Sequence, residues 1–85
     1  MKIKKGVVIQ KMGDTFVAYD NATSTLHELN EVAYDILLAL EKGKSKGKIA
    51  NLLSSKYLGS QRKAEKDLNE FLKELKTKNL IEGRK

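Results

Sequence analysis

The sequence predicts an α+β fold in which a three-stranded antiparallel meander precedes three helices, in the order βββααα. Short runs rich in β-branched and aromatic residues are confined to the first third of the chain. From residue 31 onward, apolar residues recur instead at three- and four-residue spacing, which is typical of helices with one buried face. We expect the 85 residues, 1–85, to form a single domain with the helices packed on one face of a small sheet.

The strands are expected between about residues 7 and 29. Gly13-Asp14 favours a tight hairpin between the first two, because glycine tolerates a positive φ at the first central position. The turn-forming segment 20–24 separates the second strand from the third. Short links between consecutive strands predict an antiparallel meander. The expected strands are Val7–Gln10, Thr15–Tyr19 and Thr25–Leu29.

The helices are expected at about residues 31–42, 46–58 and 61–78. Asn30 is suited to cap the first helix, since its short side-chain acceptor satisfies amides of the first turn, and Gly43 is expected to end it. Leu29 then anchors the strand end in the core, so the third strand and the first helix share one rigid corner. The expected buried faces are Val32, Ala33, Ile36, Leu37 and Leu40 on the first helix, Ile49, Leu52, Leu53 and Tyr57 on the second, and Ala64, Leu68, Phe71, Leu72 and Leu75 on the third.

Two polar residues mark the remaining helix boundaries. Ser45 is expected to cap the second helix. Asn79 is a suitable left-handed stop for the third, after which Leu80 and Ile81 fold back onto the core.

The composition restricts the partners and the cellular compartment. The net charge of +6, from 17 Lys+Arg against 11 Asp+Glu, suits a polyanion or an acidic peptide. Without cysteine the chain forms neither a disulfide nor a thiolate metal site. The longest apolar run, Ile36–Leu40, is too short to cross a bilayer, and the basic N-terminus lacks the apolar core of a signal peptide. We therefore expect a cytoplasmic protein that does not bind membranes.

No catalytic or metal-binding constellation is recognisable. His27 is the only histidine and lies in a predicted strand, away from any paired-histidine spacing. The carboxylates of Asp67, Glu70 and Glu74 alternate with lysines, as on a solvated helix face. There is no glycine-rich phosphate-binding loop, because Gly43, Gly47 and Gly59 are spread over helix boundaries. We expect no enzyme activity, metal or cofactor.

One binding hypothesis follows from the lysines around the turn between the first two helices. The layout is winged helix-turn-helix-like, and the basic region Lys42–Lys48 suits DNA phosphates. The third helix argues against it, because it exposes four carboxylates and carries one arginine, Arg62, the residue type that makes the commonest specific base contact. The strands also precede the helices, whereas a wing usually follows the recognition helix. Nucleic acid is therefore the less favoured partner.

The other hypothesis, peptide binding, comes from an ordered set of residues between about Val7 and Ile81. The set comprises Leu29-Asn30, Ala33, Ile36-Leu37, Gly43, Ile49-Ala50, Leu53, Tyr57, Asp67-Leu68, Phe71-Leu72, Leu75 and Leu80-Ile81. No single motif in the set is specific, but together these residues resemble the PqqD-like family, the RiPP recognition elements that bind leader segments of ribosomally made precursor peptides. Departures from the family pattern are Asn79 in place of a common glycine, a lysine-rich turn and strands poor in aromatic residues. They leave open the quinone-cofactor branch, the lasso-peptide branch and another served by a radical-SAM maturase.

The resemblance implies that a leader peptide adds as an antiparallel strand to the third strand and lies against the third helix. The segment 24–29 contains neither proline nor lysine, the residues that commonly block an exposed strand edge. The resemblance further implies a partner enzyme, such as a radical-SAM maturase, a leader peptidase or a cyclase. The protein itself is expected to be a monomer or an edge-strand dimer. The expected peptide-binding residues are Ser24, Thr25, Leu26, His27 and Glu28 on the strand, and Lys63, Asp67 and Phe71 on the helix.

Overall fold

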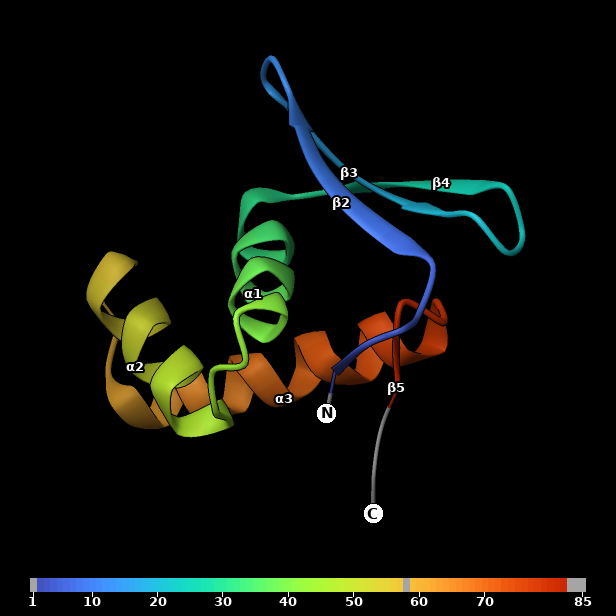
Figure 1. Cartoon of the computed structure of the whole chain (residues 1–85). Coiled ribbons are helices and arrows are strands. Elements are labelled where there is room, and N and C mark those ends of the chain that lie inside the picture. The colour runs from blue at the N-terminus through green and yellow to red at the C-terminus, as the bar shows by residue number, and fades with distance from the viewer. Residues whose placement is uncertain (1, 58, 83–85) are drawn as a thin grey trace.

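The computed structural model describes residues 2–57 and 59–82 and has the predicted fold class, an antiparallel meander followed by three helices (Figure 1). Leu58, at the expected end of the second helix, lies outside the described residues. Two short strands at the ends of the chain add to the predicted elements. The strands are β1 (Lys2–Ile3), β2 (Val7–Met12), β3 (Thr15–Asp20), β4 (Thr25–Leu29) and β5 (Ile81–Glu82), and the helices are α1 (Glu31–Glu41), α2 (Lys46–Lys56) and α3 (Gln61–Thr77).

The meander has the strand order β2-β3-β4, with antiparallel pairing throughout. A two-residue turn, Gly13-Asp14, joins Met12 to Thr15. Gly13 has a φ of 63° in this turn, in the left-handed region that glycine adopts without strain. The β3–β4 turn contains a second left-handed residue, Ser24, with a φ of 54°. The two short turns hold the strands in one register, in which Tyr19 lies opposite both Val8 and Leu26.

The second sheet joins the two ends of the chain, since β1 pairs with β5 and places Ile3 opposite Ile81. Asn79 ends α3 with the expected left-handed backbone, φ 65°, and Leu80 and Ile81 are then buried. The sequence indicated this return but not β1, because one isoleucine between lysines gives no periodic signal. Ile81 and Glu82 are therefore paired with β1, not with the meander.

The core lies between the meander and the three helices, with α1 between the sheet and α3 (Figure 1). Asn30 Oδ1 accepts a 2.8 Å hydrogen bond from the amide of Ala33, so α1 begins one residue after β4 ends. Ser45 caps α2 in the same way. Among the described residues, no helix is long and apolar enough to cross a membrane. The fully buried large side chains are Ile36, Leu37, Ile49, Leu68 and Leu80.

The buried face of α2 differs from the expected one. Leu52 and Tyr57 were expected in the core, yet they are 39% and 40% exposed. The helix is short and peripheral, so its contacts with α1 and α3 cover only the narrow face formed by Ile49, Ala50 and Leu53. Two large apolar side chains of α2 are therefore left at the surface.

One buried ion pair links the N-terminal segment to the meander. Asp20, 2% exposed, accepts a 3.1 Å hydrogen bond from Lys4 Nζ and a 3.0 Å bond from the amide of Ala22. The bond from Lys4 outweighs the effect of burial, so the pKa of the Asp20 carboxyl lies below its usual value. The ion pair thus fixes Lys4, just after β1, against the start of the β3–β4 turn.

We expect Asp20→Asn to remove a pH-dependent part of the stability. Because the folded-state pKa of Asp20 is lowered, the ionised carboxylate stabilises the fold above the ordinary carboxyl pKa, about 4. This contribution is lost as the pH falls through the lowered folded-state value. The variant should melt below the parent protein at neutral pH, and the gap should close well below pH 4, as measured by circular dichroism. Asp14→Asn, an exposed turn residue, is the control; a gap that persists in acid would contradict the assignment.

Candidate functional site

The open side of β4 is the first component of the candidate site. β4 pairs with β3 on one side, and no strand pairs with its other side anywhere in residues 2–57 and 59–82. A two-residue hairpin turn closes on a hydrogen-bonded pair, here Met12 with Thr15, and bonded pairs then alternate along antiparallel strands. By this alternation Thr25, His27 and Leu29 bond to β3. Leu26 and Glu28 therefore direct their N–H and C=O groups to the open side.

The side chains of β4 alternate between the two faces of the sheet. Thr25, His27 and Leu29 share the face of Ala18 that packs on the core; His27 is half-buried and Leu29 is 7% exposed. Leu26 and Glu28 project from the outer face, where Leu26 is 60% exposed. Ser24 lies in the preceding turn with a left-handed backbone, so it stands at the entrance of the edge rather than within it.

The opposite edge of the meander has a different chemistry. Lys11 of β2 pairs with Phe16, shares its inward face and holds its ammonium nitrogen 5.8 Å from the centre of the Phe16 ring. An inward-pointing charge on an edge strand opposes the docking of another strand, because docking would desolvate it. β4 carries no such charge on its inner face. Of the two edges of the meander, β4 is therefore the better receptor for a further strand.

The second component is an apolar pocket of about 180 Å³ between the first turn of α1, the end of α2 and the first half of α3. Lys63, Asp67 and Phe71 all line it, so the structure brings the three expected helix residues together. Lys63 Nζ lies 3.5 Å from Asp67 Oδ2, in an exposed ion pair, and Phe71 is half-buried. The expected strand residues 24–28 do not line this pocket. Its other lining residues are Val32, Leu53, Ser54, Tyr57, Gly59 and Ala64.

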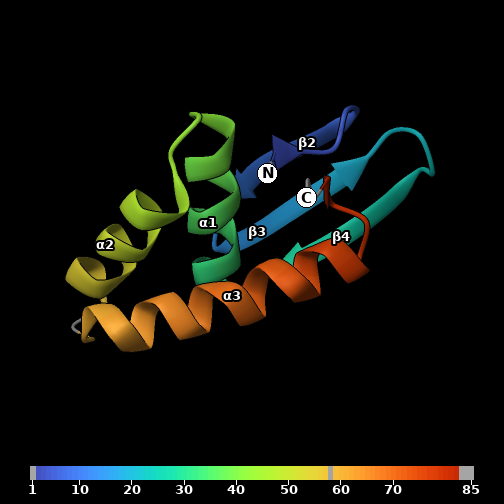
Figure 2. The same cartoon turned by 90° about the horizontal axis from the view of Figure 1, so that it is seen from below.

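The pocket and the strand edge are connected through the chain. Val32 lines the pocket from the first turn of α1, three residues beyond the end of β4 at Leu29. Figure 2 shows α3 on the β4 side of the molecule, with β2 on the far side of the sheet. The candidate site is thus the open side of β4, continued at its Leu29 end by the pocket on α3.

Sequence reasoning missed a polar cluster at one wall of this pocket. Asp35 Oδ2 accepts 2.7 Å hydrogen bonds from both Lys56 Nζ and the Tyr57 hydroxyl, and Glu31 lies 3.3 Å from Lys56. The bond to Asp35 is the main reason that the pKa of Lys56 is raised. Burial, followed by the bond to Asp35, raises the pKa of Tyr57 to about 12. The partners are 21 and 22 residues apart, a separation that no local pattern reveals.

The chain is similar to one protein family and to solved structures of known proteins. Residues 15–81 match the family model for coenzyme PQQ synthesis protein D (PqqD). The chain belongs to the PqqD family. Among solved structures, it is similar to "TbiB1 in Complex with the TbiA(beta) Leader Peptide", with a TM-score of 0.88, 33% identity and coverage of 100% of this chain and 99% of that one. "Lasso peptide synthetase B1 complexed with the leader peptide" shares the fold, with a TM-score of 0.82, 23% identity and 93% coverage of each chain. Comparison with curated proteins gave no match.

The PqqD match includes both components of the candidate site. It begins at Thr15, the first residue of β3, and ends at Ile81, so it contains β4 and the pocket-lining residues of all three helices. The similarity to the TbiB1 structure extends to β1 and β2 as well. The resemblance predicted from the sequence is therefore confirmed at the level of the PqqD family and its fold.

We expect Asp35→Asn to lower the pKa of Tyr57 in this PqqD-family protein, because it removes the negative charge that opposes formation of tyrosinate. In the parent protein the neutral hydroxyl of Tyr57 contributes stability that is fully present below the ordinary tyrosine pKa, about 10. This contribution is lost as the pH rises through the folded-state pKa, about 12. The chemical shift of the tyrosine Cζ, followed by NMR from neutral to high pH, reports the change. Tyr57→Phe assigns the signal, and Glu70→Gln, exposed on α3, is the control. An unchanged titration in Asp35→Asn would show that the bond does not persist in solution.

Proposed function

We propose that this PqqD-family protein binds the leader segment of a ribosomally synthesised precursor peptide by strand addition to β4, and presents the precursor to a modifying enzyme. The observation that carries the proposal is the strand edge that ends beside an apolar pocket. Strand addition supplies affinity through main-chain hydrogen bonds, and pockets for alternate side chains supply specificity. The TbiB1 structure, a complex with a leader peptide at 33% identity, supports the same ligand class.

The geometry suggests a direction for the bound segment. A leader antiparallel to β4 has its N-terminal part at the Leu29 end, where the pocket on α3 opens. Its main chain pairs with Leu26 and Glu28, and its inward side chains lie on the same face as His27. A large apolar side chain near the N-terminal end of the segment is then the natural occupant of the pocket, beside Phe71. The leader residues that determine specificity are thus expected to precede the paired strand.

Charge and order set the strength of the complex. The net charge of +6 steers an acidic leader, which speeds encounter more than it tightens binding. A leader that is disordered when free loses conformational entropy when it pairs, and the strand hydrogen bonds and the filled pocket must exceed this loss. We expect micromolar or tighter affinity, about −8 kcal/mol.

In the proposed role the protein is an adaptor without catalysis or cofactor. The adaptor holds the leader and thereby raises the local concentration of the attached core peptide near the enzyme. A radical-SAM maturase, a leader peptidase or a cyclase would each act on a substrate held in this way. The same edge of β4 also allows two copies to pair, so an edge-to-edge dimer competes with peptide capture.

The DNA-binding alternative uses a different surface. The lysines of the region 42–48 are exposed around the turn between α1 and α2, away from β4.

We expect the TbiA(beta) leader peptide, titrated into the ¹⁵N-labelled protein, to shift the amide signals of residues 24–28 and of α3. Duplex DNA at two salt concentrations is the comparison. Shifts confined to residues 42–48 that weaken steeply with salt would instead favour nucleic acid.

We expect Glu28→Pro to weaken binding of this leader peptide by about tenfold or more. The Glu28 amide points to the open side of β4, so proline there deletes a donor for the incoming strand without removing a bond to β3. Lys11→Pro, which deletes the corresponding outward amide on β2, is the matched control and should bind normally. Isothermal titration calorimetry measures the affinities, and thermal melting shows whether both variants are folded. An equal loss in the two variants, or none in Glu28→Pro, would contradict strand addition at β4.

A further inference from the structure

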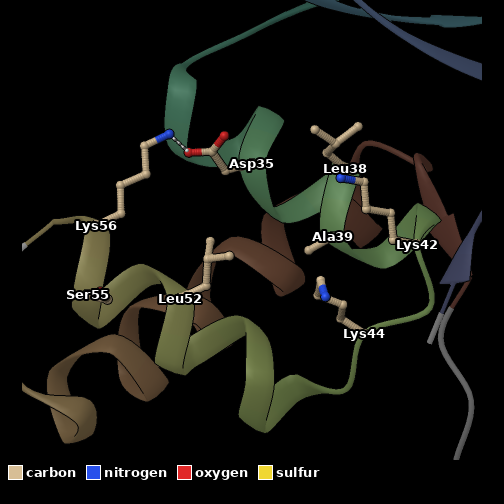
Figure 3. Close-up of a pocket in the computed structure, with 8 residues that line it drawn as sticks. All are labelled: Asp35, Leu38, Ala39, Lys42, Lys44, Leu52, Ser55 and Lys56. Atoms are coloured by element: carbon tan, nitrogen blue, oxygen red, sulfur yellow. Dashed lines mark hydrogen bonds and ion pairs between the residues drawn. The ribbon is translucent and has the colours of Figure 1, made fainter.

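A second cleft lies between α1 and α2 and is separate from the candidate leader site (Figure 3). Its volume is about 430 Å³, larger than the pocket on α3. The apolar surface comes from Leu38, buried Ala39 and Leu52, which is 39% exposed. The polar lining residues are Asp35, Lys42, Lys44, Ser55 and Lys56.

Helix α2 separates the cleft from the pocket. Leu52, Ser55 and Lys56 face the cleft, whereas Leu53, Ser54 and Tyr57 line the pocket on α3. At 100° per residue these two sets lie on nearly opposite sides of the helix. A molecule in the cleft therefore leaves the pocket and the open side of β4 accessible.

The two ends of the cleft differ in charge, since one is positive and the other is neutral. At the turn end, Lys42 and Lys44 direct their side chains toward Leu38 and Ala39 (Figure 3), and neither has an acidic partner within the described part of the chain. At the other end the lining residues Asp35 and Lys56 form a 2.7 Å ion pair, so their charges cancel. The apolar residues lie between the two ends, so the cleft favours an occupant with a defined direction.

We propose that the cleft is a docking site for an amphipathic helix of a second protein, with acidic residues in the first turn of that helix. Two packed helices form a groove that receives a third helix through its apolar side chains. Carboxylates favour the N-terminal turn of a helix, and there they would meet Lys42 and Lys44. The apolar residues of the occupant pack on Leu38, Ala39 and Leu52, and its neutral or basic end lies beside Asp35. Nucleic acid fits less well, because the apolar floor and the carboxylates do not match a phosphate backbone.

The test uses a synthetic helical peptide of about 14 residues with glutamates in its first turn, leucines along one face and lysines in its last turn. Titrated into the ¹⁵N-labelled full chain, it should shift the amides of Leu38, residues 42–44, Leu52 and Ser55. A peptide with the two charged ends exchanged should bind about tenfold more weakly. Equal binding of both peptides, or no shift in these residues up to about 1 mM peptide, would overturn the proposal. Shifts of residues 42–48 by duplex DNA, without a response to the peptide, would assign the surface to nucleic acid.

Variants separate this site from the leader site. Leu52→Glu places a carboxylate on the apolar floor and should abolish binding of the helical peptide, while the TbiA(beta) leader peptide binds as before. Lys42→Glu combined with Lys44→Glu should reverse the preference between the two helical peptides. Lys66→Glu combined with Lys73→Glu makes the same change in net charge on the exposed surface of α3 and should leave the preference intact. If this control also reverses it, overall charge rather than the cleft governs binding, and the proposal fails whether or not the leader site is real.

Discussion

The candidate site depends on the backbone N–H and C=O groups on the open side of β4, which have no partner strand among the described residues. Within the described residues, three features leave this side without a pairing strand. Asn30 starts α1 immediately, so the chain leaves the sheet instead of forming another strand. The return segment Leu80–Glu82 pairs with β1, and the two-residue turn at Gly13 fixes the pairing so that Leu26 and Glu28 face outward. Water satisfies these groups in the free protein, and an incoming strand satisfies them equally well.

An open edge is useful only when its chemistry distinguishes it from other exposed edges. β2 is also an edge strand, but Lys11 on its inner face opposes the approach of another chain. β4 instead leads to an apolar pocket at the corner where the strand becomes α1. In the proposed function, backbone pairing at β4 and side-chain selection beside α3 therefore both depend on one strand-to-helix junction.

The sequence predicted those features that depend on neighbouring residues. Helix caps at Asn30 and Ser45, the left-handed stop at Asn79 and the turn at Gly13 are local, and their residue types carry the signal. Pairing between distant segments carries none, so β1 and the bonds of Asp35 to α2 were missed. The three α3 residues were expected because the resemblance places the leader against the third helix and they lie one helical turn apart, and they line one pocket. Val32 and Leu53 in the same pocket have the same periodicity as core residues, and only the packing of three helices shows that they line a pocket.

Helix α2 lies between the pocket on α3 and the cleft on α1. This position explains why Leu52 of the helix and Tyr57 at its C-cap are exposed. A helix buried on one narrow face cannot place Leu52 and Tyr57 in the core, and each instead borders a different cavity. A single carboxylate oxygen of Asp35 bonds to Lys56 on the cleft side and to Tyr57 on the pocket side. Lys56 and Tyr57 are consecutive residues at the end of α2, and both bonds attach this end of the helix to Asp35 of α1.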